Sequence, residues 1–306
     1  DVSMSIDKGE ILGVVGESGA GKSLTGSAII GLLDPPGYLA AGEIVFDGRR
    51  IDGLSPKQMR SVRGRQISMI FQDPLTSLDP LFSIGDQLCE TIRTHLKLGR
   101  EEAREKAIGL LDAVGVPAAA ERIDHFPHQF SGGMRQRVVI ALALCANPRL
   151  IVADEPTTAL DVSVQAQVIA LLKSLCRERG TAVMLVTHDM GVIAEAADRV
   201  VVMYAGRVVE TGAVGDVIHD AKHPYTQGLM GAIPTIGESA ESLVQIDGAM
   251  PRLNERRHNC AFSDRCPKAM PACFRAPPEF TTIGSRQVAC YLYGDAAVQN
   301  PEDDGS

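Results

Sequence analysis

The sequence predicts an α/β fold in which helices cover a mainly parallel sheet. Short apolar runs alternate with helical stretches at Leu150–Ala153, Ala182–Val186 and Arg199–Met203, which is typical of parallel strands joined by helices. In addition, a Gly-rich turn joins the apolar run Ile11–Val15 to a helical segment that begins at Ser23. These two observations indicate a doubly wound sheet, and such sheets bind ligands at the carboxyl ends of their strands.

Other segments predict further elements in chain order. Asp1–Ile6 is expected to be part of a strand whose start lies outside this sequence, and Glu43–Ile51 a hairpin that turns at Asp47-Gly48. Ile67–Phe71 predicts a buried strand. From about residue 74 to 146 the pattern is helical, with apolar residues three and four positions apart at Ala103, Ala107, Leu110, Leu111 and Val114.

The chain is expected to contain two domains. It has 306 residues, and after Pro234 the apolar periodicity gives way to Gly, Ser, Pro and charged residues. We therefore expect one domain at residues 1–235, with the all-helical insertion at about 74–146, and a small C-terminal extension at residues 236–306.

Composition excludes several classes of protein. The chain has 30 basic and 38 acidic residues, a net charge of -8, which argues against nucleic acid as a partner. Apolar stretches such as Val138–Ala146 are shorter than the roughly 18 to 20 residues of a membrane-spanning helix. No secretory signal pattern occurs at the start, which predicts a soluble chain in a reducing cytoplasm.

The segment GESGAGKS matches G-x-x-x-x-G-K-[ST] between a predicted strand and a predicted helix. In this pattern the backbone N–H groups curl around phosphates, Lys22 places a cation on the β- and γ-phosphates, and the Ser23 hydroxyl binds Mg2+. The pattern therefore predicts a nucleotide site. Its expected residues are Gly16, Glu17, Ser18, Gly19, Ala20, Gly21, Lys22, Ser23 and Leu24.

Two adjacent acids end the apolar run Leu150–Ala153. Alone, such a pair most often marks a solvated turn. With a phosphate loop upstream, the pair predicts that Asp154 holds Mg2+ and that Glu155 orients and deprotonates an attacking water molecule. Gln72 and His188 also follow predicted strands, and each would be unremarkable by itself.

The segment FSGGMRQR, residues Phe130–Arg137, places Ser131, Gly132 and Gly133 just before a helical apolar run. A hydroxyl and two unhindered N–H groups at a helix N-terminus form an anion site. The segment resembles the LSGGQ signature of ATP-binding cassette (ABC) proteins. The order of phosphate loop, Gln72, signature, acidic pair, TTALD and His188 is similar to that family from Asp1 to about Arg207.

This resemblance implies a P-loop ATPase fold of the ABC type, with ATP and Mg2+ as ligands. It implies that Gln72 senses Mg2+ and contacts membrane subunits, and that His188 contacts the γ-phosphate. It also implies that Ala159, Leu160 and Asp161 form the D-loop, with Asp161 among the ATP-binding residues. Ser23, Gln72 and Asp154 are the expected metal-binding residues. The signature residues would act on ATP held by a second ATPase subunit, so one chain alone is expected to hydrolyse ATP poorly.

The element HPYTQGLMGAIP, which begins at His223, resembles the C-terminal extension of oligopeptide and dipeptide importer ATPases, most closely their D-type subunit. That resemblance implies a heterodimer with a homologous ATPase, two transmembrane permease subunits and an extracytoplasmic peptide-binding protein. It places the chain on the cytoplasmic face of the membrane. The transported substrate stays open among dipeptides, oligopeptides, glutathione and nickel chelates.

Four cysteines in the extension, Cys260, Cys266, Cys273 and Cys290, lack the C-x2-C pairs of most structural zinc sites. Four thiols in a short, weakly hydrophobic segment suit a [4Fe-4S] cluster, which the family resemblance also implies; zinc and free thiols are the alternatives. Cys89, Cys145 and Cys176 lie in apolar helical settings and are expected to fill the core.

Other ATPase classes fit the sequence less well. ABC ATPases that act on ribosomes carry two cassettes in one chain, and those that repair DNA need a long coiled coil between phosphate loop and signature. This sequence has one phosphate loop and a short separation between Ser23 and Ser131. A metabolic P-loop kinase would have no use for the signature or for Asp161.

Overall fold

The computed structural model describes residues 2–73, 76–157, 160–231, 246–251 and 258–294. The chain forms two compact units. The first comprises residues 1–5, 12–22 and 187–306, and the second comprises residues 6–11 and 23–186. The boundary expected near residue 235 lies outside the described residues.

Three parallel strands run side by side in the second unit, in the order β4, β5, β6. They are β4 (Ile67–Ile70), β5 (Leu150–Asp154) and β6 (Ala182–Val186). All residues of β5 and β6 are buried, as expected for strands covered on both faces. Because parallel strands end at one edge, β5 and β6 bring their carboxyl ends to the same side of the unit.

The hairpin of the second unit consists of β2 (Val45–Phe46) and β3 (Arg49–Arg50). Asp47 and Gly48 have φ values of 53° and 74°, the positive values that a tight two-residue hairpin turn requires. The predicted hairpin is therefore confirmed. The prediction of a strand at residues 1–6 is wrong, because the structure has no strand in the described residues 2–6.

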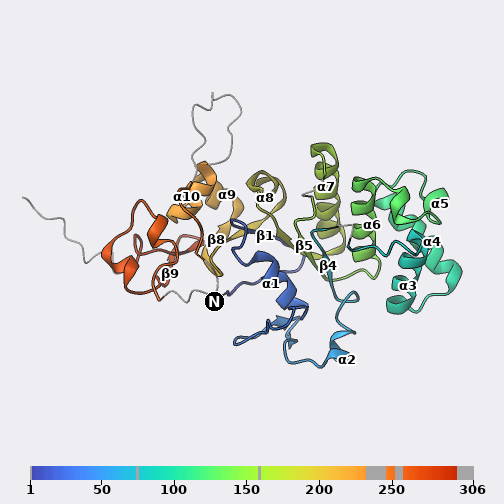
Figure 1. The fold of residues 1–306 in the computed structure, drawn as a ribbon, viewed down its shortest axis with the longest axis horizontal. Coiled ribbons are helices and arrows are strands. Elements are labelled where there is room, and N and C mark those ends of the chain that lie inside the picture. The colour runs from blue at the N-terminus through green and yellow to red at the C-terminus, as the bar shows by residue number, and fades with distance from the viewer. Residues whose placement is uncertain (1, 74–75, 158–159, 232–245, 252–257, 295–306) are drawn as a thin grey trace, which may run out of the picture. The chain divides into compact units, whose positions relative to one another are not determined.

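Helices make up the rest of the second unit; α3 and α4 lie beside α6, and α5 lies beside α4 (Figure 1). Between residues 76 and 146 every element is helical, and α4 buries the stripe that contains Ala103, Ala107 and Leu111. The helices are α1 (Lys22–Ile29, whose first residue belongs to the first unit), α2 (Pro56–Met59), α3 (Ile84–Leu96), α4 (Arg100–Ala113), α5 (Ala119–Arg122), η1 (Pro127–Gln129), α6 (Gly132–Leu144) and α7 (Val162–Arg179).

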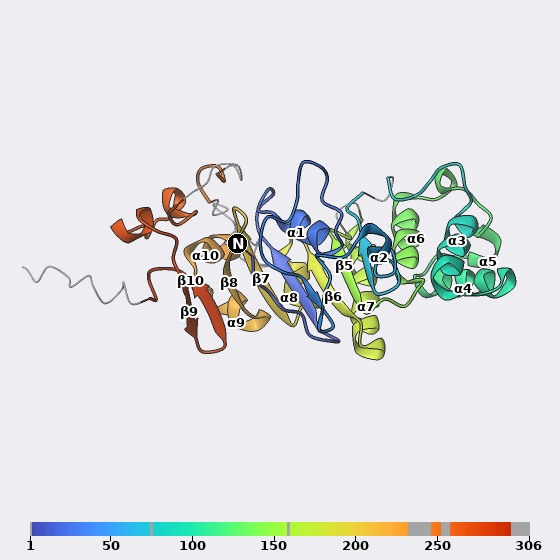
Figure 2. The same ribbon diagram turned by 90° about the horizontal axis from the view of Figure 1, so that it is seen from below.

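Five strands form the sheet of the first unit, in the order β1, β7, β8, β10, β9. They are β1 (Ile11–Val15, whose first residue belongs to the second unit), β7 (Arg199–Tyr204), β8 (Arg207–Ala213), β10 (Arg286–Ala289) and β9 (Phe280–Ile283). β1 and β7 are parallel, and the other neighbours are antiparallel. Figure 2 shows β9 and β10, from the C-terminal extension, beside β8.

The helices of the first unit are short. They are α8 (Met190–Ala196), α9 (Val214–His219), α10 (Pro224–Gly231), η2 (Ser263–Arg265) and η3 (Pro271–Phe274). In the part of the chain that is described, no helix of either unit combines the length and the apolar character needed to cross a membrane.

Candidate active site

The phosphate loop, residues Gly16–Ser23 and called the P-loop below, curls between β1 and α1. Gly16, Gly19 and Gly21 have φ values of 154°, 82° and 97°. At Gly16 a Cβ would lie 2.2 Å from the carbonyl oxygen of Met203 in β7, so a side chain has no room there. The sequence therefore uses glycine where the loop must turn against its neighbouring strand.

Lys22 lies inside this curl. Its Nζ atom donates to the carbonyl oxygens of Gly16 at 2.7 Å and Glu17 at 3.1 Å, and the residue is 5% exposed. A buried ammonium group beside a turn of backbone N–H groups gives a compact site of positive potential. This arrangement is suited to a polyphosphate.

Ser23 and Asp154 meet at the end of β5. The Ser23 Oγ atom donates to Asp154 Oδ1 at 3.0 Å, and Asp154 is buried as the last residue of the strand. Close packing of α1 on β5 allows this contact, because a Cβ at Gly26 would lie 2.9 Å from Val152 Cγ1. A hydroxyl and a carboxyl oxygen side by side are ligands that Mg2+ accepts together with phosphate oxygens.

Glu155 follows directly and has an unusual backbone, with a φ of 46°. Its N–H donates to the carbonyl oxygen of Val186 at the end of β6, over 2.9 Å, and this bond supports the left-handed conformation. Its carboxyl Oε2 accepts a hydrogen bond from Nε2 of the exposed Gln72 at 2.9 Å. Glu155 is partly exposed and its carboxyl partner Gln72 is exposed, so water can reach this group.

The signature segment lies at the start of α6. Ser131 caps the helix, with its Oγ accepting from the N–H of Met134 at 3.3 Å, and Ser131 and Gly132 are exposed. Farther along α6, the buried Gln136 donates to the carbonyl oxygen of Pro156 at 2.7 Å. The signature helix is therefore tied to the residue that follows Glu155.

Asp161 caps α7, where its Oδ1 accepts from the N–H of Val164 at 3.1 Å. A Cβ at Gly133 would lie 3.7 Å from Leu160 Cδ2, so the Asp161 loop and the signature are neighbours. Thr158 and Ala159 of the same loop lie outside the described residues.

His188 is exposed and follows β6. The neighbouring Thr187 N–H donates to the carbonyl oxygen of Val14 in β1 at 3.2 Å, and Asp189 caps α8. His188 belongs with Lys22 to the first unit, whereas Gln72, Asp154, Glu155 and the signature belong to the second. Within the second unit the structure thus joins Ser23 to Asp154 and Gln72 to Glu155.

The extension does not present a ready metal site in the described residues, since no three His, Cys, Asp or Glu side chains there are arranged to hold a metal ion. Burial raises the pKa of the Cys260 and Cys266 thiols, and raises the pKa of Cys290 to about 11. A bound metal would itself deprotonate its thiol ligands, so these pKa values describe the metal-free thiols only. The described residues give no support to the [4Fe-4S] cluster that the spacing suggested, because they contain no group arranged to hold a metal ion.

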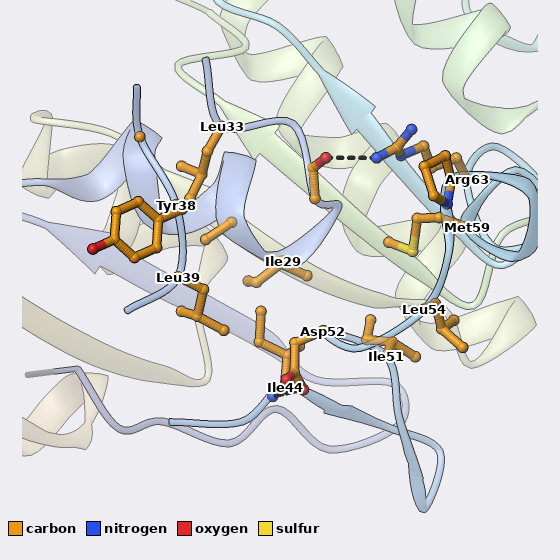
Figure 3. A pocket seen from close by; sticks show the side chains of 14 residues that line it. Ile29, Leu33, Tyr38, Leu39, Ile44, Ile51, Asp52, Leu54, Met59 and Arg63 are labelled. Carbon is orange, nitrogen blue, oxygen red and sulfur yellow. Dashed lines mark hydrogen bonds between the residues drawn. The ribbon is translucent and has the colours of Figure 1, made fainter. Parts of the chain in front are cut away.

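A groove of about 290 Å³ also lies in the second unit, and its lining differs from that of the P-loop (Figure 3). Its lining is mostly apolar, with side chains such as Ile29, Tyr38 and Leu39. Arg63 donates to the carbonyl oxygens of Ile30 and Gly31, and Asp52 accepts from Arg50. Because most of its lining residues are apolar, the groove does not suit phosphate groups.

Two further residues at the P-loop escaped the sequence motifs. Tyr225 and Arg265 both contact Glu17, although they lie 208 and 248 positions away in the chain. Tyr225 is part of the His-Pro-Tyr element. That element indicated a protein family, but it did not indicate a contact with the P-loop. No spacing in the sequence pointed to Arg265.

The sequence matches the family described as ABC transporter over residues 1–158, and the one described as oligopeptide/dipeptide transporter, C-terminal region, over residues 209–273. It is 48% identical to the oligopeptide transport ATP-binding protein OppD of Bacillus subtilis, covering 99% of this chain and 86% of that protein. It is 44% identical to the dipeptide transport ATP-binding protein DppD of Escherichia coli, covering 97% of this chain and 91% of that protein.

Solved structures show the same likeness. The dimeric ATP-binding cassette MJ0796 bound to ADP and Pi has a TM-score of 0.64 and 30% identity, covering 70% of this chain and 89% of that chain. The cassette cbiO1 of Clostridium perfringens has a TM-score of 0.61 and 30% identity, covering 71% of this chain and 82% of that chain. The expected α/β ATPase fold is therefore confirmed, and the chain belongs to the ABC transporter family, among the oligopeptide and dipeptide transport ATP-binding proteins.

Proposed function

We propose that this chain is the ATP-hydrolysing subunit of an ABC importer of dipeptides or oligopeptides. The main support is the paired arrangement after β5, where Asp154 meets the P-loop residue Ser23 and Glu155 meets Gln72. One carboxyl group is buried against a hydroxyl and the next is partly exposed to water. The two adjacent acids thus have different roles, since Asp154 binds a cation and Glu155 accepts a proton.

The roles of the residues follow from these positions. Lys22 and the P-loop N–H groups bind the β- and γ-phosphates of ATP, and Ser23 and Asp154 hold Mg2+, which withdraws charge from the phosphate oxygens when bound. Glu155 orients the attacking water and takes its proton, while Gln72 steadies the Glu155 carboxyl group. We propose that His188 contacts the γ-phosphate.

The signature completes the site of a second subunit. Ser131 and Gly132 are exposed at the N-terminus of a 13-residue helix. A surface that binds the phosphates of another molecule must be exposed in this way. Asp161 lies in the neighbouring loop and would contact that subunit. We propose a heterodimer with a homologous ATPase, bound to two permease subunits on the cytoplasmic face of the membrane and served by an extracytoplasmic binding protein.

The peptide substrate is supported by the full-length similarity to peptide transport proteins, which includes the C-terminal region. Glutathione and nickel chelates are the alternatives within the same transporter class. An ATPase acting on ribosomes or DNA is less favoured, because relatives with those roles would not need this C-terminal region.

Residues 1–235 and 236–306 remain our proposed domains, with the helical insertion at about 74–146.

Reconstitution tests this function. The chain is assembled with its permease and ATPase partners in vesicles, and ATP hydrolysis is measured with binding protein loaded with dipeptide, oligopeptide, glutathione or a nickel chelate. We expect peptides to stimulate hydrolysis. Stimulation by glutathione or nickel chelate alone would contradict the peptide assignment, and absence of ATP hydrolysis under every condition would contradict the ATPase assignment.

A [4Fe-4S] cluster in the extension is a separate proposal, supported only by the four cysteines and their shared segment. Anaerobically purified protein would then absorb near the edge of the visible range and contain about four iron atoms per chain, as such a cluster requires. Colourless protein that contains zinc, or no metal, would contradict it.

A further inference from the structure

The C-terminal region contacts the P-loop directly. The N–H of Glu17 donates to the hydroxyl oxygen of Tyr225 at 2.8 Å. The carboxyl group of Glu17 accepts two parallel hydrogen bonds from the Arg265 guanidinium group, at 2.8 and 3.0 Å. All three residues belong to the first unit. Both the backbone and the side chain of one P-loop residue are therefore fixed from outside the loop.

Arg265 is itself held firmly. Its Nε and Nη2 atoms donate to the carbonyl oxygens of Asp247 and Ile246 at 2.8 and 2.9 Å. The guanidinium carbon lies 5.8 Å from the centre of the Tyr204 ring, and the side chain is 7% exposed. The Glu17 side chain is 28% exposed, so the pair is half-buried. A two-pronged, half-buried ion pair with this much support is worth more than a fully exposed one, which usually contributes little.

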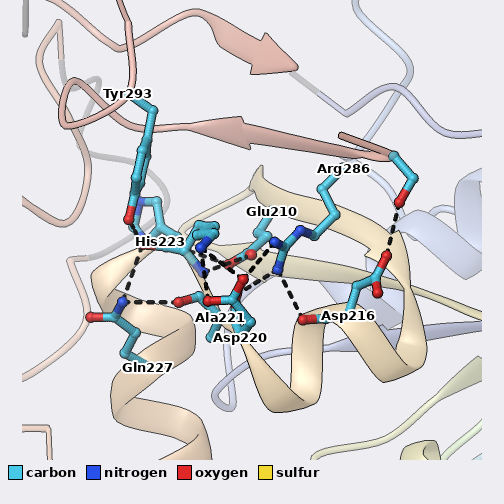
Figure 4. Close-up of polar contacts among 10 residues, drawn as sticks. Glu210, Asp216, Asp220, Ala221, His223, Gln227, Arg286 and Tyr293 are labelled. Carbon is cyan, nitrogen blue, oxygen red and sulfur yellow. Dashed lines mark hydrogen bonds and ion pairs between the residues drawn. The ribbon is translucent and has the colours of Figure 1, made fainter. Parts of the chain in front are cut away.

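Tyr225 is fixed by its own packing. It is fully buried, and its ring lies 4.6 Å from that of Tyr204 and 5.4 Å from that of Phe262. The backbone N–H of Tyr225 donates to Nδ1 of His223. The backbone N–H of His223 in turn donates to Glu210 in β8 (Figure 4). The His-Pro-Tyr element therefore anchors the tyrosine hydroxyl to the sheet.

A third contact reaches the middle of the loop. A Cβ at Gly19 would lie 3.0 Å from the methyl carbon of Met250, so this methionine borders the P-loop where its backbone turns. Met250 and Arg265 both belong to the C-terminal extension. The extension thus borders the loop at two of its eight positions.

We propose that Tyr225 and Arg265 are positioning residues through which the C-terminal region sets the affinity of the P-loop for ATP. The proposal rests on the proposed function in one respect, that ATP binds at Gly16–Ser23. Two physical effects combine. A loop held in its binding conformation loses less conformational freedom when ligand binds, and Arg265 offsets a Glu17 negative charge that would otherwise repel the triphosphate.

The test is the dissociation constant of ATP for the full chain, measured by calorimetry without magnesium so that no hydrolysis occurs. We expect Arg265→Gln to raise the constant by about tenfold, the effect of losing one strong charge-assisted contact. Tyr225→Phe removes only the hydroxyl and should raise it by about threefold. Arg275→Gln, at an exposed arginine of the same extension, is the control and should leave it unchanged.

A double variant separates positioning from general destabilisation. In the Arg265→Gln background, Glu17→Gln removes the unpaired charge, so it should restore part of the lost affinity. Further weakening by the second substitution would overturn the proposal, as would an Arg265→Gln chain that binds ATP as the unmodified chain does. If the Arg265→Gln chain does not fold, the test rests on Tyr225→Phe. An ATP affinity of Tyr225→Phe equal to that of the unmodified chain would then overturn the proposal. No ATP binding by the unmodified chain would contradict the proposed function instead.

Discussion

Two glutamates in this chain are held in opposite ways. Glu155 follows β5 with a strained backbone and is partly exposed, and Gln72 from the chain surface donates to its carboxyl group. Glu210, in β8, is fully buried, and its two oxygens accept the N–H groups of Lys222 and His223 at 2.9 Å each (Figure 4).

The difference separates chemistry from architecture. A carboxyl group bonded to an exposed amide can exchange that partner for water, whereas one that accepts two backbone N–H groups in a buried site keeps its partners unless the chain unfolds. Glu155 is thus suited to accept a proton during catalysis. Glu210 joins the His-Pro-Tyr element to the sheet and, through Tyr225, to the P-loop.

The largest expected effect on folding is at Glu210. Glu210→Gln replaces one accepting oxygen with an NH2 group that faces an N–H donor, which should lower the free energy of unfolding by about 3 kcal/mol. Denaturant unfolding followed by circular dichroism measures this loss. Glu121→Gln, at an exposed glutamate of α5, is the control. If Glu210→Gln and Glu121→Gln have equal free energies of unfolding, Glu210 does not stabilise the fold. The contrast between Glu155 and Glu210 would then fail.

A second effect on folding is expected at His223, and it appears only as the pH falls. Burial lowers its pKa to about 4, so the folded chain keeps this imidazole neutral at pH values where an unfolded chain protonates it. The stability that depends on neutral His223 is complete above about pH 6.5 and is lost as the pH falls toward 4, up to about 3 kcal/mol.

The measurement is the free energy of unfolding between pH 7 and pH 4 for the unmodified chain and for His223→Gln. Carboxyl groups titrate in both chains, so the difference between their pH slopes isolates His223. We expect a flatter slope in the variant, and His219→Gln, at an exposed histidine of α9, should keep the original slope. Parallel curves for His223→Gln and the unmodified chain would show that His223 does not carry this dependence.

Much of the nucleotide site could be predicted because its chemistry is local in the sequence. Lys22 and Ser23 lie in one octapeptide, and Asp154 and Glu155 end one apolar strand. Ser23 and Asp154 were each expected to hold Mg2+, and in the structure Ser23 Oγ lies 3.0 Å from Asp154 Oδ1.

The contacts of the C-terminal region could not be predicted in the same way. The bond between Glu17 and Arg265 joins residues 248 positions apart. Glu17 stands at a position that the P-loop pattern leaves open, and Arg265 belongs to no pattern. Strands β9 and β10 were not expected because each is four residues long and only partly apolar. Residues 1–6 looked like a strand because they alternate apolar and polar side chains, yet they have no strand partner among the described residues.

The most direct test of the central claim is Glu155→Gln in the assembled transporter. Gln keeps the size of Glu155 and one oxygen that can accept the hydrogen bond from Gln72, but it cannot take a proton from water. We predict unchanged ATP affinity, an unfolding free energy within about 0.5 kcal/mol of the unmodified chain, and ATP turnover at least about 100-fold slower. Undiminished turnover, or lost turnover accompanied by lost ATP binding and stability, would contradict the assignment of Glu155 as the catalytic base.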